Sequence, residues 1–135
     1  MKELFVELLN HVNVEFNNKL ITCELDEYVT KILLNATIIS IVKNNKLQSF
    51  IAYYDNDEAK KNAYLSMIVT RRDARNLGLG KILINSMLDN LKEQNFESLG
   101  LEVLKTNDKA LEIYIKYNFR IVDENDTHYK MIKKL

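Results

Sequence analysis

The feature of this sequence that most constrains its fold is the position of its few glycines. The chain has 135 residues, no proline and three glycines, and two of these, Gly78 and Gly80, fall within one short segment. Glycine lets the backbone adopt positive φ and approach a ligand closely. A chain that concentrates its glycine in one place points to that segment as a functional one.

Hydrophobic periodicity places the glycine segment between a strand and a helix. Apolar residues at helical spacing predict helices over 2–17, 24–35, 78–94 and 107–118. β-Branched and alternating stretches predict strands over 37–42, 47–54, 63–70, 99–104, 119–122 and 127–132. The helix over 78–94 is expected to bury Ile82, Leu83, Met87, Leu88 and Leu91.

The order of these elements predicts an α+β architecture. Asn44 and Asn45 separate the first two strands and are a turn signal, so those strands should form an antiparallel hairpin. The strand–helix–strand unit over 63–104 has the length of a parallel crossover. The size predicts one domain over 1–135, with two helices in 1–36 and a mixed, mostly antiparallel sheet with its helices in 37–135.

Composition narrows the classes of function. Lys plus Arg and Asp plus Glu both number 19, so no domain-wide basic field for nucleic acid is expected. One cysteine, Cys23, and two histidines, His11 and His128, provide neither a disulfide framework nor a metal cluster, and we expect no metal. Cys23 is interpreted as a small core or boundary residue. No apolar run long enough for a membrane span and no signal peptide are visible, so we expect a cytoplasmic protein without a membrane partner.

The glycine segment has the chemistry of an anion site. The first N–H groups of a helix have no internal partner, and the helix dipole is positive there. Gly78 and Gly80 let a diphosphate approach these groups, and Arg75 and Lys81 add positive charge. The segment is not a Walker A loop, and Leu83 occupies the third glycine position of a dinucleotide fingerprint. A glycine-rich helix start without a ligand stays open as the alternative from this segment alone.

Two motifs together resemble one family. The pattern Arg75-x-x-Gly78-x-Gly80 resembles the acetyl-CoA loop of the GNAT superfamily of N-acetyltransferases. The stretch over 101–119 matches the family pattern Leu-Glu-Val-x-x-x-Asn-x-x-Ala-x-x-x-Tyr-x-Lys-x-Gly-Phe except at Asn118, where the family has glycine. Asparagine tolerates the same left-handed conformation. The resemblance covers residues 37–132 and implies helices on both faces of the sheet and a parallel, splayed strand pair at the acetyl-CoA site.

The resemblance also implies a reaction and its residues: transfer of acetyl from acetyl-CoA to a primary amine. The residues implied to bind acetyl-CoA are Ile68, Val69, Thr70, Arg75, Asn76, Leu77, Gly78, Leu79, Gly80, Lys81, Asn107, Ala110 and Tyr114. Tyr114 matches the general acid that protonates the leaving thiolate, and Glu102 is the leading base for the incoming ammonium. An N–H group near Ile68 would polarise the thioester carbonyl.

Each of these roles has a plainer alternative. Tyr114 could be a core aromatic, Asn107 an ordinary helix N-cap and Glu102 a solvated strand residue. Weaker candidates for the base are Tyr64, Ser66 and Asp55. Arg71 and Arg72 could contact the 3′-phosphate of CoA, although a solvated loop is the favoured interpretation for both.

The acceptor amine is not identified by the sequence. The family usually opens with a strand, whereas this chain is predicted to open in a helix, and residues 1–36, where acceptor pockets of the family are usually shaped, match no family pattern. A neutral chain favours a small-molecule amine. The alternatives are the N-terminal or lysine amine of a protein, or a non-catalytic acetyl-CoA-binding sensor or partner module. The resemblance further allows a homodimer, since dimers are common in the family.

Overall fold

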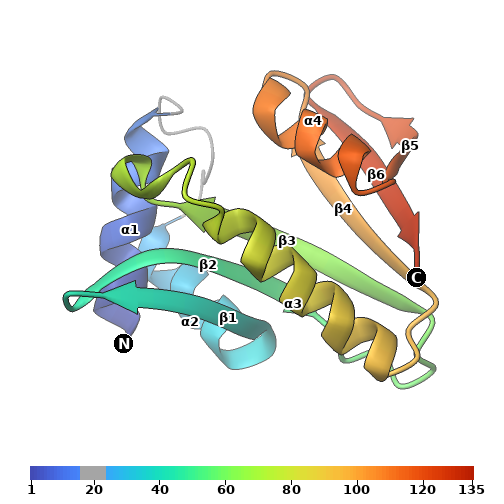
Figure 1. The fold of residues 1–135 in the computed structure, drawn as a ribbon, viewed down its shortest axis with the longest axis horizontal. Helices are drawn as coiled ribbons and strands as arrows, with labels where there is room; N and C mark the ends of the chain where they lie inside the picture. Colours follow the sequence, from blue (N-terminus) through green and yellow to red (C-terminus); the bar gives the residue numbers. More distant parts are fainter. Residues whose placement is uncertain (16–23) are drawn as a thin grey trace. The chain divides into compact units, whose positions relative to one another are not determined.

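The computed structural model describes residues 1–15 and 24–135 (Figure 1). The helices are α1 (Lys2–Glu15), α2 (Leu25–Asn35), α3 (Leu79–Glu93) and α4 (Asp108–Lys116), with a short 3₁₀ turn η1 (Arg72–Ala74). The strands are β1 (Thr37–Lys43), β2 (Lys46–Tyr54), β3 (Asn62–Thr70), β4 (Ser98–Leu104), β5 (Arg120–Glu124) and β6 (His128–Lys134). Every predicted element is present, and the chain as given opens in α1. The end of the first predicted helix and Cys23 lie outside the described residues.

The six strands form one sheet in the order β1-β2-β3-β4-β6-β5. The β1–β2 hairpin turns at Asn44 and Asn45, whose φ angles of 55° and 62° suit the primed turn that a two-residue hairpin favours. β3 and β4 pair in parallel from Asn62↔Ser98 to Leu65↔Leu101, while β3 continues to Thr70 and β4 to Leu104. The mostly antiparallel sheet with one parallel pair is therefore confirmed.

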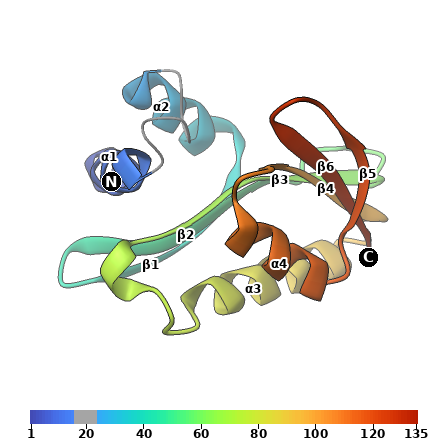
Figure 2. The ribbon, with the colours of Figure 1, turned by 90° about the horizontal axis from the view of Figure 1, so that it is seen from above.

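The described residues divide into two compact units, of which the first comprises Met1–Tyr53 and Met67–Met87. In this unit α1 and α2 cover one face of the strands and the first half of α3 lies on the other (Figure 2). The rings of Phe5 and Phe50 meet edge-to-face with their centroids 4.9 Å apart. The core of this face is formed by Phe5, Leu8, Leu9, Val12, Val29, Ile32, Leu47, Phe50, Ala52 and Val69.

The buried face of α3 differs from the predicted one at one position. Ile82 was expected in the core, but it is 54% exposed, whereas Ile84 is 3% exposed. Each helical residue turns by about 100°, so the buried stripe that contains Leu83, Ile84 and Met87 leaves Ile82 beyond its edge. Ile82 and Ile84 flank Leu83 in the sequence, so a buried stripe through either isoleucine fits the pattern. Only the packing of α3 decides which of the two is buried.

The second unit comprises Tyr54–Ser66 and Leu88–Leu135. Leu101 of β4 is buried and lies opposite Met131 of β6 in the antiparallel register. Asn118 ends α4 with φ of 70°, and the N–H of Phe119 donates to the carbonyl oxygen of Tyr114 at 3.0 Å. This is the left-handed helix ending expected of an asparagine in place of the family's glycine, so that expectation is confirmed.

Over the described part of the chain, none of the helices has the length and apolar character that crossing a membrane requires.

Candidate active site

The segment between β3 and α3 has the unusual backbone that its glycines predict. Asn76 and Gly78 both have positive φ, 66° and 79°. A Cβ atom at Gly78 would meet nothing within 4 Å, so Gly78 is required by its backbone angle and not by lack of space. A Cβ atom at Gly80 would lie 3.9 Å from Cδ1 of Ile68, an ordinary contact. Backbone of alternating handedness is typical of loops that bind anions through N–H groups.

The N–H groups that open α3 are available to a ligand. The first helical hydrogen bond is donated by the N–H of Ile82 to the carbonyl oxygen of Gly78, at 3.1 Å. Among the described residues, no hydrogen bond is recorded for the N–H groups over 78–81, at the positive end of the helix dipole. Lys81 of this first turn is exposed, as are Arg72 and the acidic Asp73 of the preceding turn η1. This arrangement can bind a diphosphate.

The end of β3 is hydrogen-bonded to the loop that follows it. Nε of Arg75 donates to the carbonyl oxygen of Thr70 at 3.2 Å, which holds this guanidinium against the strand. The hydroxyl of Ser49 donates to the carbonyl oxygen of Val69 and also contacts the hydroxyl of Thr70, both at 2.8 Å. The side chain of Val69 is buried in the core, so it is not available to contact a ligand. Ile68 lies toward Gly80.

Arg71 does not lie in a solvated loop, and that expectation is wrong. Its side chain is 7% exposed and forms a bidentate ion pair with Glu7 of α1. Nε and Nη2 also donate to the carbonyl oxygen of Leu47, at 3.2 and 3.1 Å. Arg72 is exposed, as expected. The buried pair could not have been found from the sequence, because Glu7 and Arg71 are 64 positions apart and nothing local marks them.

The Glu7–Arg71 pair predicts a dependence of stability on pH. The hydrogen bond from Arg71 lowers the pKa of Glu7 below its usual 4.5 in the folded protein. A lowered folded-state pKa adds stability above the unfolded-state value, and this stability is lost as pH falls through the folded-state value. Glu7→Gln should therefore reduce the free energy of unfolding at neutral pH and flatten its decline below about pH 5. Urea unfolding at several pH values measures the free energy of unfolding at neutral pH and its decline at acidic pH. If this free energy fell equally with pH in the parent and in Glu7→Gln, the prediction would be contradicted.

Tyr114 is buried in the second unit at 8% exposure. Its ring lies 5.6 Å from that of Phe119, centroid to centroid. Burial raises the pKa of Tyr114 to about 12. The phenol is protonated at neutral pH, as an unshifted tyrosine also is, so it can donate a proton there and cannot act as a base. The interpretation as a core aromatic is compatible with this donor role.

Asn107 is the N-cap of α4, as its plainer interpretation predicted. Its side-chain oxygen accepts from the N–H of Ala110 at 3.2 Å. The connection that leads into α4 is held by Lys105, which forms an ion pair with Glu124 at 2.8 Å and lies over the ring of Tyr129 at 5.2 Å. Sequence reasoning missed Lys105, since its partners lie in the closing hairpin.

Three of the four candidate bases, Tyr64, Ser66 and Glu102, lie on one face of strands β3 and β4. Glu102 is exposed on β4, and its cross-strand neighbour on β6 is Lys130. Tyr64 of β3 lies opposite Gly100 and is 40% exposed. Because side chains alternate along a strand, Tyr64, Ser66 and Glu102 point to the face opposite Leu101. Asp55 instead accepts a hydrogen bond from Gln94 at 2.9 Å in a loop.

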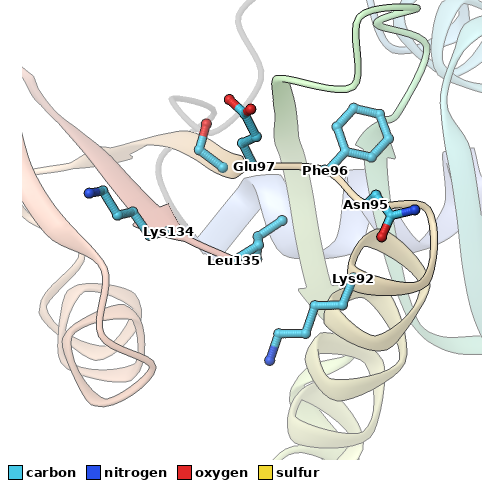
Figure 3. A pocket seen from close by; sticks show the side chains of 7 residues that line it. Lys92, Asn95, Phe96, Glu97, Lys134 and Leu135 are labelled. Carbon is cyan, nitrogen blue, oxygen red and sulfur yellow. The ribbon is translucent and has the colours of Figure 1, made fainter.

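Two surface hollows have linings that include none of the predicted site residues. One of about 560 Å³ is formed in the second unit at the end of α3 and around Leu135, with Lys92 and Lys134 at its rim (Figure 3). The other, of about 350 Å³, lies in the first unit between α1 and α2, and Glu7 contributes to its lining. In the described part of the chain, no three His, Cys, Asp or Glu side chains gather as a metal site would require.

Comparison with known proteins identifies the family to which this chain belongs. The model of the acetyltransferase (GNAT) family matches residues 5–119, so this chain belongs to that family. The chain is 32% identical over 80 residues to "Probable N-acetyltransferase san" of Drosophila melanogaster and 28% identical over 80 residues to "N-alpha-acetyltransferase 50" of Danio rerio. Each match covers 58% of this chain and 44% or 48% of the relative. The chain thus matches just under half the length of these curated relatives.

Solved structures agree on the fold. The crystal structure of the PaiA N-acetyltransferase from Thermoplasma acidophilum in complex with coenzyme A superimposes with a TM-score of 0.79 at 18% identity. The superposition covers 99% of this chain and 92% of the other. At this identity the likeness establishes the GNAT fold.

Proposed function

We propose that this protein is an acetyl-CoA-dependent N-acetyltransferase that acts on a primary amine. The observation that carries the proposal is the start of α3, where the N–H groups over 78–81 have no recorded partner within the described residues. Gly78 and Gly80 leave these groups uncovered by side chains, and Arg72 and Lys81 add positive charge. A diphosphate is the anion of CoA that such a helix start would bind.

The remaining roles follow from direct transfer. The amine nitrogen forms a bond to the acetyl carbon, and the bond from that carbon to sulfur breaks. In this proposal Tyr114, which is protonated at neutral pH, donates its proton to the leaving thiolate and regains one from the nitrogen of the intermediate, which loses its second proton to become the amide. Glu102, acting directly or through water, removes the proton of the ammonium, and an N–H group near Ile68 polarises the thioester carbonyl. Asn107 and Ala110 are proposed to contact acetyl-CoA at the start of α4.

The acceptor is proposed at the level of a primary amine. A formal net charge of zero favours a small molecule. The similarity to N-alpha-acetyltransferase 50 of Danio rerio favours a protein α-amine as the second candidate. The cytoplasmic location and a homodimer stay predictions from the sequence.

Calorimetric titration with acetyl-CoA tests the proposal, with NAD and ATP as controls. We expect a dissociation constant in the micromolar range for acetyl-CoA, about −8 kcal/mol, and no binding of the controls at that concentration. Failure to bind acetyl-CoA would overturn the proposal. A thiol-release assay then compares polyamines, amino sugars, amino acids and short peptides with free or blocked N-termini. Binding without thiol release on any amine would replace the enzyme by an acetyl-CoA-binding sensor.

A further inference from the structure

The Glu7–Arg71 pair joins α1 to the first residue of the loop that precedes α3. Arg71 follows β3 directly, and Glu7 lies in the middle of α1. Nη1 of Arg71 donates to one carboxylate oxygen of Glu7 at 3.0 Å, and Nη2 donates to the other. The arginine is buried, while Glu7 is 48% exposed. Glu7 is not needed to fill the core, so its contribution comes from what it does to Arg71.

Arg71 is held by its backbone as well as by its side chain. Its N–H donates to the carbonyl oxygen of Gln48 at 2.8 Å. Its own carbonyl oxygen accepts from the N–H of Ala74 at 2.9 Å, which closes the 3₁₀ turn η1. The guanidinium donates in addition to the carbonyl oxygen of Leu47. The orientation of Arg71 therefore sets the direction in which the turn leaves β3.

The 3₁₀ turn η1 helps to position the backbone N–H groups of the loop that follows it. Arg75, the next residue after η1, is hydrogen-bonded back to Arg72 at 3.4 Å through its N–H and to Thr70 at 3.2 Å through Nε. Beyond Arg75, no backbone N–H over 76–81 has a recorded partner within the described residues. The position of these groups thus depends on the turn over 71–75 and on the helix that follows.

We propose that Glu7 is a positioning residue for acetyl-CoA: it fixes the fork of Arg71, and through it the turn that presents the N–H groups over 78–81 to the diphosphate. The inference rests on the proposed function of that loop. Ligand binding by backbone groups is strongest when they are already in place, because no ordering cost is then paid on binding. A bidentate arginine fixes orientation in a way that a lysine, with its single ammonium, does not.

The test compares Glu7→Gln, Arg71→Lys and the double variant by calorimetry with acetyl-CoA. We expect the dissociation constant to rise about tenfold in each single variant, since misplaced binding groups cost up to about 100-fold and the backbone bonds of Arg71 remain. Both changes break the same fork, so the double variant should be no weaker than either single one. Glu7→Asp keeps the charge and should restore part of the affinity.

Lys2→Ala is the matched control, because Lys2 of α1 forms an exposed ion pair with Asp26 of α2 at 2.9 Å. It should leave the dissociation constant within about twofold of the parent. Once an acceptor is found, the KM for acetyl-CoA should rise in Glu7→Gln while kcat at saturation stays within about twofold. A general distortion of the active site would lower kcat as well.

The outcomes separate this inference from the function on which it rests. If the unmodified protein does not bind acetyl-CoA, the proposed function itself fails. If it binds and the folded Glu7→Gln and Arg71→Lys variants bind equally well, the positioning role is wrong. An equal loss in Lys2→Ala would also overturn it, since the effect would then follow from any weakened contact of α1. All measurements are made well below the melting temperature of each variant, so that unfolding does not enter.

Discussion

Replacing Gly80 by Glu should abolish acetyl-CoA binding and leave the protein folded. Gly80 lies in the first turn of α3, where the N–H groups over 78–81 are proposed to bind the diphosphate. A carboxylate about 4 Å from a phosphate charge is opposed by about 4 kcal/mol at an effective dielectric of 20, on the order of a thousandfold in affinity. The new side chain would also occupy the space that the ligand needs.

The structure explains why this variant should fold. A Cβ atom at Gly80 makes only an ordinary 3.9 Å contact with Ile68, so the chain has room for it. An acidic side chain in the first turn stabilises a helix by about 0.3–1 kcal/mol through the dipole. We therefore expect an unchanged or slightly higher melting temperature, with no acetyl-CoA binding detected by calorimetry.

Gly80→Ala is the control for the Gly80→Glu experiment. It replaces the same hydrogen by a methyl group without a charge, and removing a helical glycine is worth about 1 kcal/mol of stability. Its dissociation constant for acetyl-CoA should stay far below that of Gly80→Glu. Should Gly80→Glu bind acetyl-CoA like the parent, the start of α3 would not be the diphosphate site.

Tyr114→Phe should lower kcat by about 100-fold, the lower end of what general acid catalysis contributes, with the affinity for acetyl-CoA within about threefold. The buried ring, its contact with Phe119 and its volume are kept. Within the described residues no hydrogen bond of the Tyr114 hydroxyl is recorded, so its removal should cost little stability. Full turnover by this variant would make Tyr114 a core aromatic.

The pH dependence provides a second readout for Tyr114. Its pKa of about 12 means that the phenol does not titrate at ordinary assay pH, so Tyr114 should cause no fall of kcat on the alkaline side below about pH 10. Tyr114→Phe should accordingly lower the whole pH profile without shifting it. A parent profile that loses an alkaline limb in the variant would show that the tyrosine titrates in the assay range.

Most of the fold could be predicted because its signals are local. Asn44 and Asn45 indicate a hairpin from their own preference for positive φ, and the structure has both angles positive. Asn118 replaces a glycine at a helix end and has the same left-handed backbone, and Asn107 caps the helix that follows it. Each of these features depends on a few neighbouring residues, so the printed sequence contains the information.

The two wrong predictions, for Ile82 and Arg71, concern features that depend on contacts between distant parts of the chain. Ile82 and Ile84 are equally apolar, and the choice between them is made by the surface against which α3 packs. The sequence predicts Arg71 to be a solvated residue of a basic loop, yet its side chain is buried against Glu7 and Leu47. Its burial is tolerated because a carboxylate and a carbonyl oxygen meet its donors, and both come from distant parts of the chain.

By itself the sequence determined the order of the elements, the hairpin, the helix caps and the two motifs that mark the family. These follow from backbone preferences and spacing over a few residues. Only the tertiary structure decided which face of α3 is buried, that burial raises the pKa of Tyr114, and that Arg71 is held by Glu7. Burial and ion pairing depend on residues that are far apart in the sequence, as Glu7 and Arg71 are at a separation of 64 positions. No local sequence pattern therefore predicts them.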